Sequence, residues 1–82
     1  MALRKLVAGN WKMNGSVAAL AELDKIAEAA KANASVDVAI CPPFTLIAGA
    51  VARTPGLTIG AQDCHMAAKG AHTGCISAAM LV

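Results

Sequence analysis

The chain has little charge, few aromatic side chains and no long apolar run, and each shortage argues against a class of protein. Its 82 residues carry seven basic and five acidic side chains, and the basic ones are scattered, which argues against a nucleic-acid partner. No apolar run approaches the roughly 18 residues of a membrane span, and the first residues do not form a secretory signal pattern. We therefore predict a cytoplasmic protein with no nucleic-acid and no membrane partner.

The apolar content is high, but the apolar side chains are small. Apolar residues make up 57% of the chain, although Trp11 and Phe44 are its only aromatic residues. A chain of this size buries only about 60% of its unfolded surface when it folds alone. The apolar run 78–82 also lacks a helix-ending signal. We expect residues 1–82 to be a single segment of a larger domain, incomplete alone, that associates with copies of itself or with complementing segments.

Apolar periodicity predicts strands that alternate with helices. Strands are expected near residues 4–10, 36–41 and 57–62, and helices near residues 16–32 and 44–53, with a third helix starting after Ser77. Ser16 is the predicted N-cap of the first helix. This alternation predicts an α/β fold with three parallel strands, two helices and the start of a third helix, joined by right-handed crossovers.

The candidate functional residues follow the first strand. In a strand-loop-helix unit, polar residues at the carboxyl end of the strand can converge on a ligand. Asn10 and Lys12 are one residue apart, so an extended backbone directs both to one side and Trp11 to the other, into packing. Lys12 could supply a fixed positive charge and Asn10 a donor to a ligand oxygen. The alternative is a surface lysine and a turn asparagine.

The three cysteines allow more than one interpretation. An odd number in an α/β chain favours free thiols. Cys64, His65, His72 and Cys75 include the ligand types that zinc accepts, but the adjacent first pair and the uneven spacing favour an ordinary loop, and we predict no metal. A bridge from Cys64 to Cys75 stays open as an alternative, because it needs close Cα atoms that a sequence does not reveal.

Four motifs resemble the triosephosphate isomerase family in order and spacing. They are NWKMNG at 10–15, CPPF at 41–44, GAQD at 60–63 and KGAHTG at 69–74. The resemblance implies part of a (βα)8 TIM barrel, because a closed barrel typically needs about 250 residues. It also implies the family's reaction, the interconversion of dihydroxyacetone phosphate and glyceraldehyde 3-phosphate in glycolysis and gluconeogenesis, without a cofactor.

The resemblance assigns roles to five residues. Asn10 and Lys12 match substrate-binding residues, and the ammonium of Lys12 would also act in catalysis by stabilising charge on the enediolate intermediate. Met13, Gln62 and Thr73 match residues at the interface between two subunits, with Thr73 at the tip of a loop that reaches the partner. For Met13 and Thr73 the alternative is ordinary loop packing, and for Gln62 it is a satisfied amide at a strand end.

The residues that transfer protons in this family are absent from the chain. The family, itself a familiar example of pKa tuning, uses a glutamate base and a neutral histidine electrophile. His65 and His72 fall in the loop after the third strand, and Glu22 and Glu28 on the solvent side of the first helix, so we interpret all four as structural. The chain alone is therefore expected to show little or no turnover.

Two departures from the family pattern concern the end of the chain. Cys75 stands where the family usually has an acidic residue, which removes a charged contact expected between subunits. Ala78 and Ala79 replace acidic or proline residues, so the third helix loses favourable first-turn chemistry. The alternative to an isomerase segment is therefore an inactive barrel fragment, natural or engineered, that self-assembles.

Overall fold

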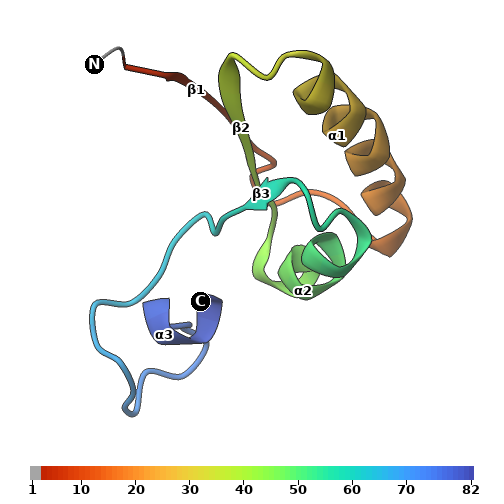
Figure 1. The fold of residues 1–82 in the computed structure, drawn as a ribbon. Coiled ribbons are helices and arrows are strands. Elements are labelled where there is room, and N and C mark those ends of the chain that lie inside the picture. Colours follow the sequence, from red (N-terminus) through yellow and green to blue (C-terminus); the bar gives the residue numbers. More distant parts are fainter. Residues whose placement is uncertain (1–2) are drawn as a thin grey trace.

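The computed structural model describes residues 3–82 as a three-stranded parallel sheet with the helices α1 and α2 against one face (Figure 1). The elements in chain order are β1 (Lys5–Asn10), the 3₁₀ helix η1 (Val17–Ala21), α1 (Glu22–Ala32), β2 (Val36–Cys41), α2 (Phe44–Arg53), β3 (Thr58–Ile59) and α3 (Ala78–Leu81). The strand order is β1-β2-β3, so each crossover adds a strand beside the previous one. The predicted α/β class with parallel strands is confirmed.

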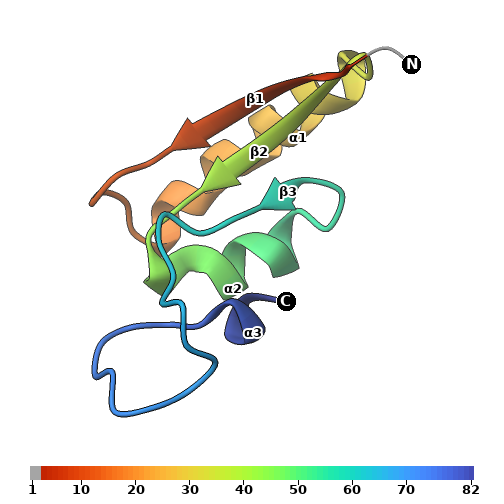
Figure 2. The same ribbon diagram turned by 90° about the vertical axis from the view of Figure 1, so that its left-hand side faces the viewer.

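The pairing of β1 with β2 decides which side chains face the helices. Paired residues of parallel strands point to the same face of the sheet. Gly9 pairs with Ile40, which is 5% exposed and belongs to the core beneath the helices. Asn10, the next residue, therefore points to the opposite face together with its partner Cys41. Figure 2 shows this opposite face toward the viewer, with α1 behind the sheet.

One apolar core fills the space between the sheet and the helices. Its buried members are Leu20, Leu23, Ile40, Leu46, Ala50 and Leu57. Leu23, from α1, has no exposed surface at all. Trp11 is half-buried and packs against this cluster, as predicted from its place between Asn10 and Lys12. The core thus anchors the segment that follows β1.

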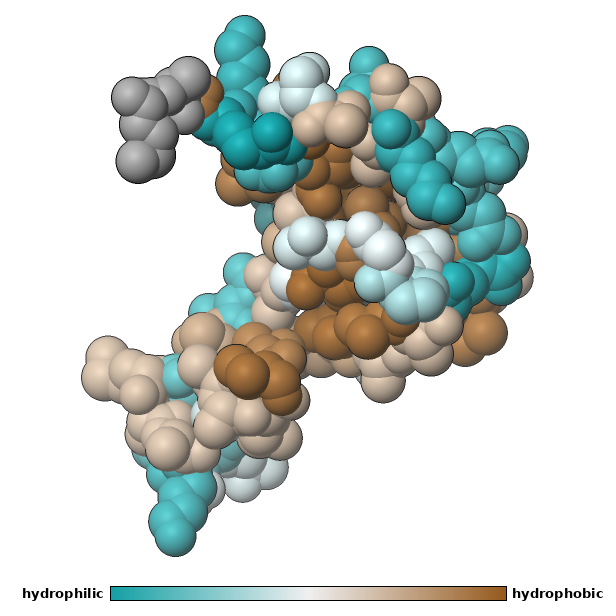
Figure 3. Space-filling view, in the orientation of Figure 1, coloured by the Kyte–Doolittle hydropathy of each residue, from teal (hydrophilic) through white to brown (hydrophobic). Residues whose placement is uncertain are grey.

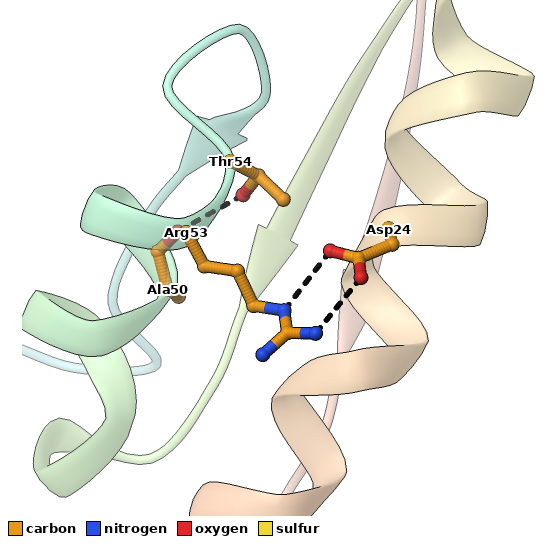
Figure 4. Close-up of polar contacts among 4 residues, drawn as sticks. All are labelled: Asp24, Ala50, Arg53 and Thr54. Carbon is orange, nitrogen blue, oxygen red and sulfur yellow. Dashed lines mark hydrogen bonds and ion pairs between the residues drawn. The ribbon is translucent and has the colours of Figure 1, made fainter.

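An ion pair joins α1 to α2 outside the core (Figure 4). The Nε and Nη2 atoms of Arg53 donate to the two carboxylate oxygens of Asp24 at 3.0 and 2.9 Å. These hydrogen bonds are the main reason why the pKa of Asp24 lies below its usual value. Both side chains are about half exposed, so the pair adds little to stability. Beside it, buried Thr54 ends α2 by donating its hydroxyl to the carbonyl of Ala50 at 2.9 Å.

The first helix begins differently from the prediction. Instead of a regular helix from residue 16, the chain forms η1 first, and α1 starts only at Glu22. Ser16 does hold the predicted N-cap position, now of η1, but its side chain makes no capping bond to the described residues. The backbone oxygen of Ser16 instead accepts from the Ala19 amide at 2.9 Å. Bonds of this 3₁₀ type tighten a helix end that lacks a side-chain cap.

The third strand is shorter than predicted. Residues 57–62 were expected to be extended, whereas β3 covers only Thr58–Ile59. Leu57 belongs to the preceding turn, because its amide donates to the carbonyl of Thr54 at 3.0 Å. The Gly60 amide makes one more bond, to the Ile40 carbonyl at 2.8 Å, and the chain then leaves β2. Within the described sheet β3 is an edge strand that pairs only with β2. No described strand on its other side adds hydrogen bonds that would lengthen it.

The predicted cap of the third helix is confirmed. The Ser77 hydroxyl accepts from the Met80 amide at 3.3 Å, while the Met80 sulfur accepts from the Ser77 amide at 3.5 Å. The two residues thereby satisfy one another's backbone donors, as in a capping box.

The helices themselves are short. Within residues 3–82, none combines the length and the apolar character that crossing a membrane requires.

The uncovered face of the sheet borders a hollow. Figure 3 shows this hollow between the strands and the β3–α3 loop, which we define as residues 60–77. β1 lies at the edge of the described sheet, and its Leu6 and Val7 are 65% and 56% exposed. A strand edge with exposed apolar side chains is a surface that proteins normally cover.

Candidate functional site

The carboxyl ends of the three strands are held together by one side chain. The amide nitrogen of Gln62 donates to the backbone oxygen of Lys12, after β1, and to that of Cys41, at the end of β2, both at 2.9 Å. The Cys41 oxygen also accepts from the Trp11 amide at 3.1 Å. Gln62 follows β3 and is half-buried. The loops after β1, β2 and β3 therefore meet at this one amide.

Asn10 fixes the backbone of Lys12. The Oδ1 atom of Asn10 accepts from the Lys12 amide at 2.7 Å, which is the local bond of an Asx turn. Lys12 itself has a φ of 59°, in the left-handed region that side chains other than glycine seldom adopt. The backbone at Lys12 is therefore not extended, as the prediction for Asn10 and Lys12 had assumed. The strand ends at Asn10, and a turn sets the direction of Lys12.

The sequence contains one signal for this turn. Asn side chains commonly bond to a backbone amide two residues ahead, and Asn10 stands two residues before Lys12. The left-handed conformation of Lys12 has no such signal, because lysine rarely adopts it. Non-glycine residues held in this region cluster at active sites and ligand clamps. The conformation thus agrees with a binding role for this segment.

We expect the variant Lys12→Gly to be more stable than Lys12→Ala. Both variants lose the ammonium, but only alanine keeps a Cβ atom in the left-handed conformation, which costs on the order of 1 kcal/mol. Urea unfolding followed by circular dichroism measures the difference. Lys25, which is exposed within α1, supplies the matched control, because inside a helix glycine should be the less stable variant by about 1 kcal/mol. The same order at both positions would contradict the strain at Lys12.

The site offers hydrogen-bond donors and a positive charge. With Oδ1 of Asn10 turned to its own backbone, the Nδ2 amide remains as a donor for a ligand oxygen. Lys12 is exposed and presents an ammonium, a compact charge with three donors. Both residues lie at the carboxyl end of β1, and Asn10 points to the uncovered face of the sheet. This arrangement suits an anionic or carbonyl oxygen.

The three residues predicted at a subunit interface occupy different environments. Met13 is 98% exposed beside Lys12. Thr73 is exposed in the β3–α3 loop, next to Gly74, whose φ is 88°. Gln62 is half-buried, and its amide nitrogen is bonded to its own chain. Met13 and Thr73 are thus accessible to a partner, whereas Gln62 holds the site together.

The cysteines and histidines of the β3–α3 loop do not form a metal centre. Among the described residues there is no group of three or more His, Cys, Asp or Glu side chains placed to hold a metal ion. All three cysteines are free, with Cys64 and Cys75 exposed, so the alternative of a bridge between these two is wrong. Glu22 and Glu28 are exposed on α1, as predicted.

Comparison with known proteins identifies close relatives. The family model described as triosephosphate isomerase matches residues 5–82. The triosephosphate isomerase of Jannaschia sp. (strain CCS1) is 59% identical over 81 residues, which cover 95% of this chain and 32% of that protein. That of Ruegeria sp. (strain TM1040) is 55% identical over 78 residues, with coverage of 95% and 31%.

A solved structure agrees with these sequence matches. The crystal structure of triosephosphate isomerase from Bartonella henselae superposes with a TM-score of 0.83 at 43% identity, over 96% of this chain and 32% of that chain. The three strands and their helices are thus part of a TIM barrel, as predicted. The chain spans about a third of the length of the relatives that it matches.

Proposed function

Because the chain belongs to the triosephosphate isomerase family, we propose that it forms about the first three strand-helix units of an isomerase barrel, with the third helix cut short. In this proposal the chain contributes substrate-binding residues to the barrel. The observation that carries this proposal is the meeting of the three strand ends at Gln62. Active sites of TIM barrels lie at the carboxyl ends of the strands. Here that end carries Asn10 and Lys12, which the family resemblance pairs with triose phosphate.

In the proposed reaction, a base removes a proton from the carbon beside the substrate carbonyl, and the proton returns to the neighbouring carbon. Negative charge grows on the substrate oxygen as the enediolate forms. The ammonium of Lys12 would stabilise this charge, and the Nδ2 amide of Asn10 would donate to a substrate oxygen. The glutamate base and the histidine electrophile of the family match no residue of this chain. The proposal assigns them to the part of the barrel that the chain does not span.

The uncovered sheet face supports the need for further segments. Eight strands close a TIM barrel, whereas the described sheet has three. Leu6 on β1 remains 65% exposed. Five further parallel strands would cover this face and both sheet edges. We infer that residues 1–82 are incomplete as a domain and function when such segments complete the barrel, in the cytoplasm where the family's reaction serves glycolysis.

The proposed interface joins two completed barrels. Thr73, exposed in the β3–α3 loop, would approach the segment around Met13 and Lys12 of a second copy. Gln62 would support that interface by holding the Lys12 backbone in place. Cys75 lies two residues from Thr73 and offers no carboxylate for an ion pair with the partner. The proposed interface therefore lacks the charged contact that the family's acidic residue would make at this position.

The proposal is tested by completing the barrel. Residues 1–82 would be joined to the part of the Jannaschia sp. relative that follows the matched region, and isomerase turnover measured with glyceraldehyde 3-phosphate. Light scattering on the same sample gives its mass. We expect turnover and a dimer from the joined protein, and no turnover from the 82-residue chain, because it lacks the proton-transfer groups.

The outcomes separate the proposal from its alternative. A joined protein that folds cooperatively by calorimetry but does not turn over substrate would contradict the assigned site. Turnover by a monomer would contradict the interface at Met13 and Thr73 alone. The alternative, an inactive fragment that self-assembles, is favoured if the 82-residue chain forms a defined oligomer and the joined protein gains no activity.

A further inference from the structure

Two histidines of the β3–α3 loop are stacked on each other. The rings of His65 and His72 have centroids 3.8 Å apart and planes inclined by 23°. His65 also ties the two ends of the loop together, because its amide donates to the Ile76 carbonyl at 2.7 Å and it forms a parallel bridge with Ser77. The stack therefore sits where the outgoing and returning parts of the loop meet.

The hydrogen bond to His65 requires an uncharged ring. Its Nδ1 atom accepts from the Ala67 amide at 2.9 Å. A ring nitrogen that accepts carries no proton, so the His65 proton is on Nε2. Protonation of Nδ1 would replace this acceptor with a second donor facing the Ala67 amide. Charging His65 thus breaks a bond inside the loop.

The described residues that line the space beside the stack include no carboxylate. This space is a hollow of about 290 Å³, and its lining includes Lys69, Cys75 and α3 residue Met80. Asp63 is the acidic residue nearest in sequence, and its Oδ1 accepts from the Cys64 amide at 2.8 Å. Helix α3 carries no titratable side chain. Two imidazolium rings at this distance would repel each other without a compensating negative charge.

A glycine permits this placement of His72. Gly70 has a φ of 146°, and a Cβ atom there would lie 3.0 Å from the His72 ring. That distance is closer than ordinary contact, so a larger residue would displace the ring. The loop backbone is therefore shaped to bring His72 onto His65.

We propose that the stacked pair His65 and His72 is a pH-sensitive latch that holds the β3–α3 loop closed while both rings are neutral. Imidazole is the side chain that ordinarily changes charge between pH 5 and 8. When both rings carry a proton on each nitrogen, their charges separate the stack and the Ala67 amide loses its acceptor, so the stack no longer holds the outgoing part of the loop to the returning part. This inference concerns the loop of this chain alone and does not depend on the proposed function.

Hydrogen exchange of the 82-residue chain tests the latch. We expect protection of the His65 and Ala67 amides, corrected for intrinsic exchange, to fall about tenfold between pH 7.5 and pH 5.5, in line with the loss of one hydrogen bond. The Leu46 amide in α2, which donates to Pro43, should keep its protection and reports on the rest of the fold.

Two substitutions supply the controls. His72→Phe keeps a ring for stacking but carries no charge, and His65→Asn keeps an acceptor near the Ala67 amide. The double variant should remain protected at pH 5.5. The proposal is overturned if the amides of residues 65 and 67 in the double variant lose protection at pH 5.5 as they do in the unaltered chain. It is also overturned if the imidazole protons of the unaltered chain titrate by NMR while both amides stay protected.

Discussion

Leu23→Ala is expected to remove a large fraction of the stability of this chain. Leu23 has no exposed surface and belongs to a core that has six buried members among residues 3–82. Replacing a buried leucine with alanine costs about 2–5 kcal/mol, because apolar contact is lost and a cavity remains. Domains have roughly 0.05–0.15 kcal/mol of stability per residue, or about 4–12 kcal/mol for a chain of this length, so the loss is a large fraction of the total.

The measurement is urea unfolding followed by circular dichroism and by the fluorescence of Trp11. This single tryptophan packs against the core, so its emission reports directly on core formation. Val17→Ala is the matched control, because Val17 is 75% exposed and its truncation should change stability by no more than about 0.5 kcal/mol. Equal unfolding midpoints for the two variants would mean that the core described here does not carry the stability of the chain.

The elements that were predicted well are those whose signals are local. β2 and α2 have the predicted bounds, 36–41 and 44–53. In β2, apolar residues alternate with polar or small ones until a pair of prolines stops the strand, and α2 then repeats apolar residues at helical spacing. Both signals lie within the element itself. Local patterns were therefore enough to place β2 and α2, which both contribute residues to the core.

The features that were missed depend on contacts between distant segments. β3 ends early because it leaves its only described neighbour after Gly60, which residues 57–62 do not reveal. Gln62 was recognised at a strand end, but its bonds to two separate loops exist only once β1, β2 and β3 are side by side. The stack of His65 on His72 likewise needs the loop to fold back at Gly70. The spacing of residues along the sequence does not predict such contacts between distant segments.

In the candidate site, too, local signals were sufficient for some features and contacts in the folded chain decided the others. The family motifs placed Asn10 and Lys12 at the end of β1, where the structure has them. The direction of Lys12 was predicted from an extended backbone and proved to be set by a left-handed turn. Residue identity could thus be read from the sequence, whereas the side-chain direction required the hydrogen bond from the Lys12 amide to Asn10.

Lys12→Met is expected to lower the turnover of the completed barrel by a factor on the order of 10²–10³, the effect of losing one preorganised electrostatic group. Methionine keeps an unbranched apolar chain and a Cβ atom, so it suffers the same left-handed strain as lysine and removes little besides the charge. Lys5→Met is the matched control, because Lys5 lies at the other end of β1, paired with Val36. Its turnover should stay within about twofold of the unaltered protein.

The division of the Lys12→Met effect between kcat and KM identifies what the ammonium does. If Lys12 only held the substrate's phosphate, it would bind substrate and transition state equally, and KM would rise while kcat stayed constant. If it also stabilises the enediolate, kcat must fall, because that charge develops only as the reaction proceeds. The rigid turn that Asn10 and Gln62 impose on Lys12 favours the second case, since a preorganised charge needs no rearrangement during reaction. We therefore expect most of the loss to appear in kcat. A change confined to KM would mean that Lys12 binds substrate but does not stabilise the transition state.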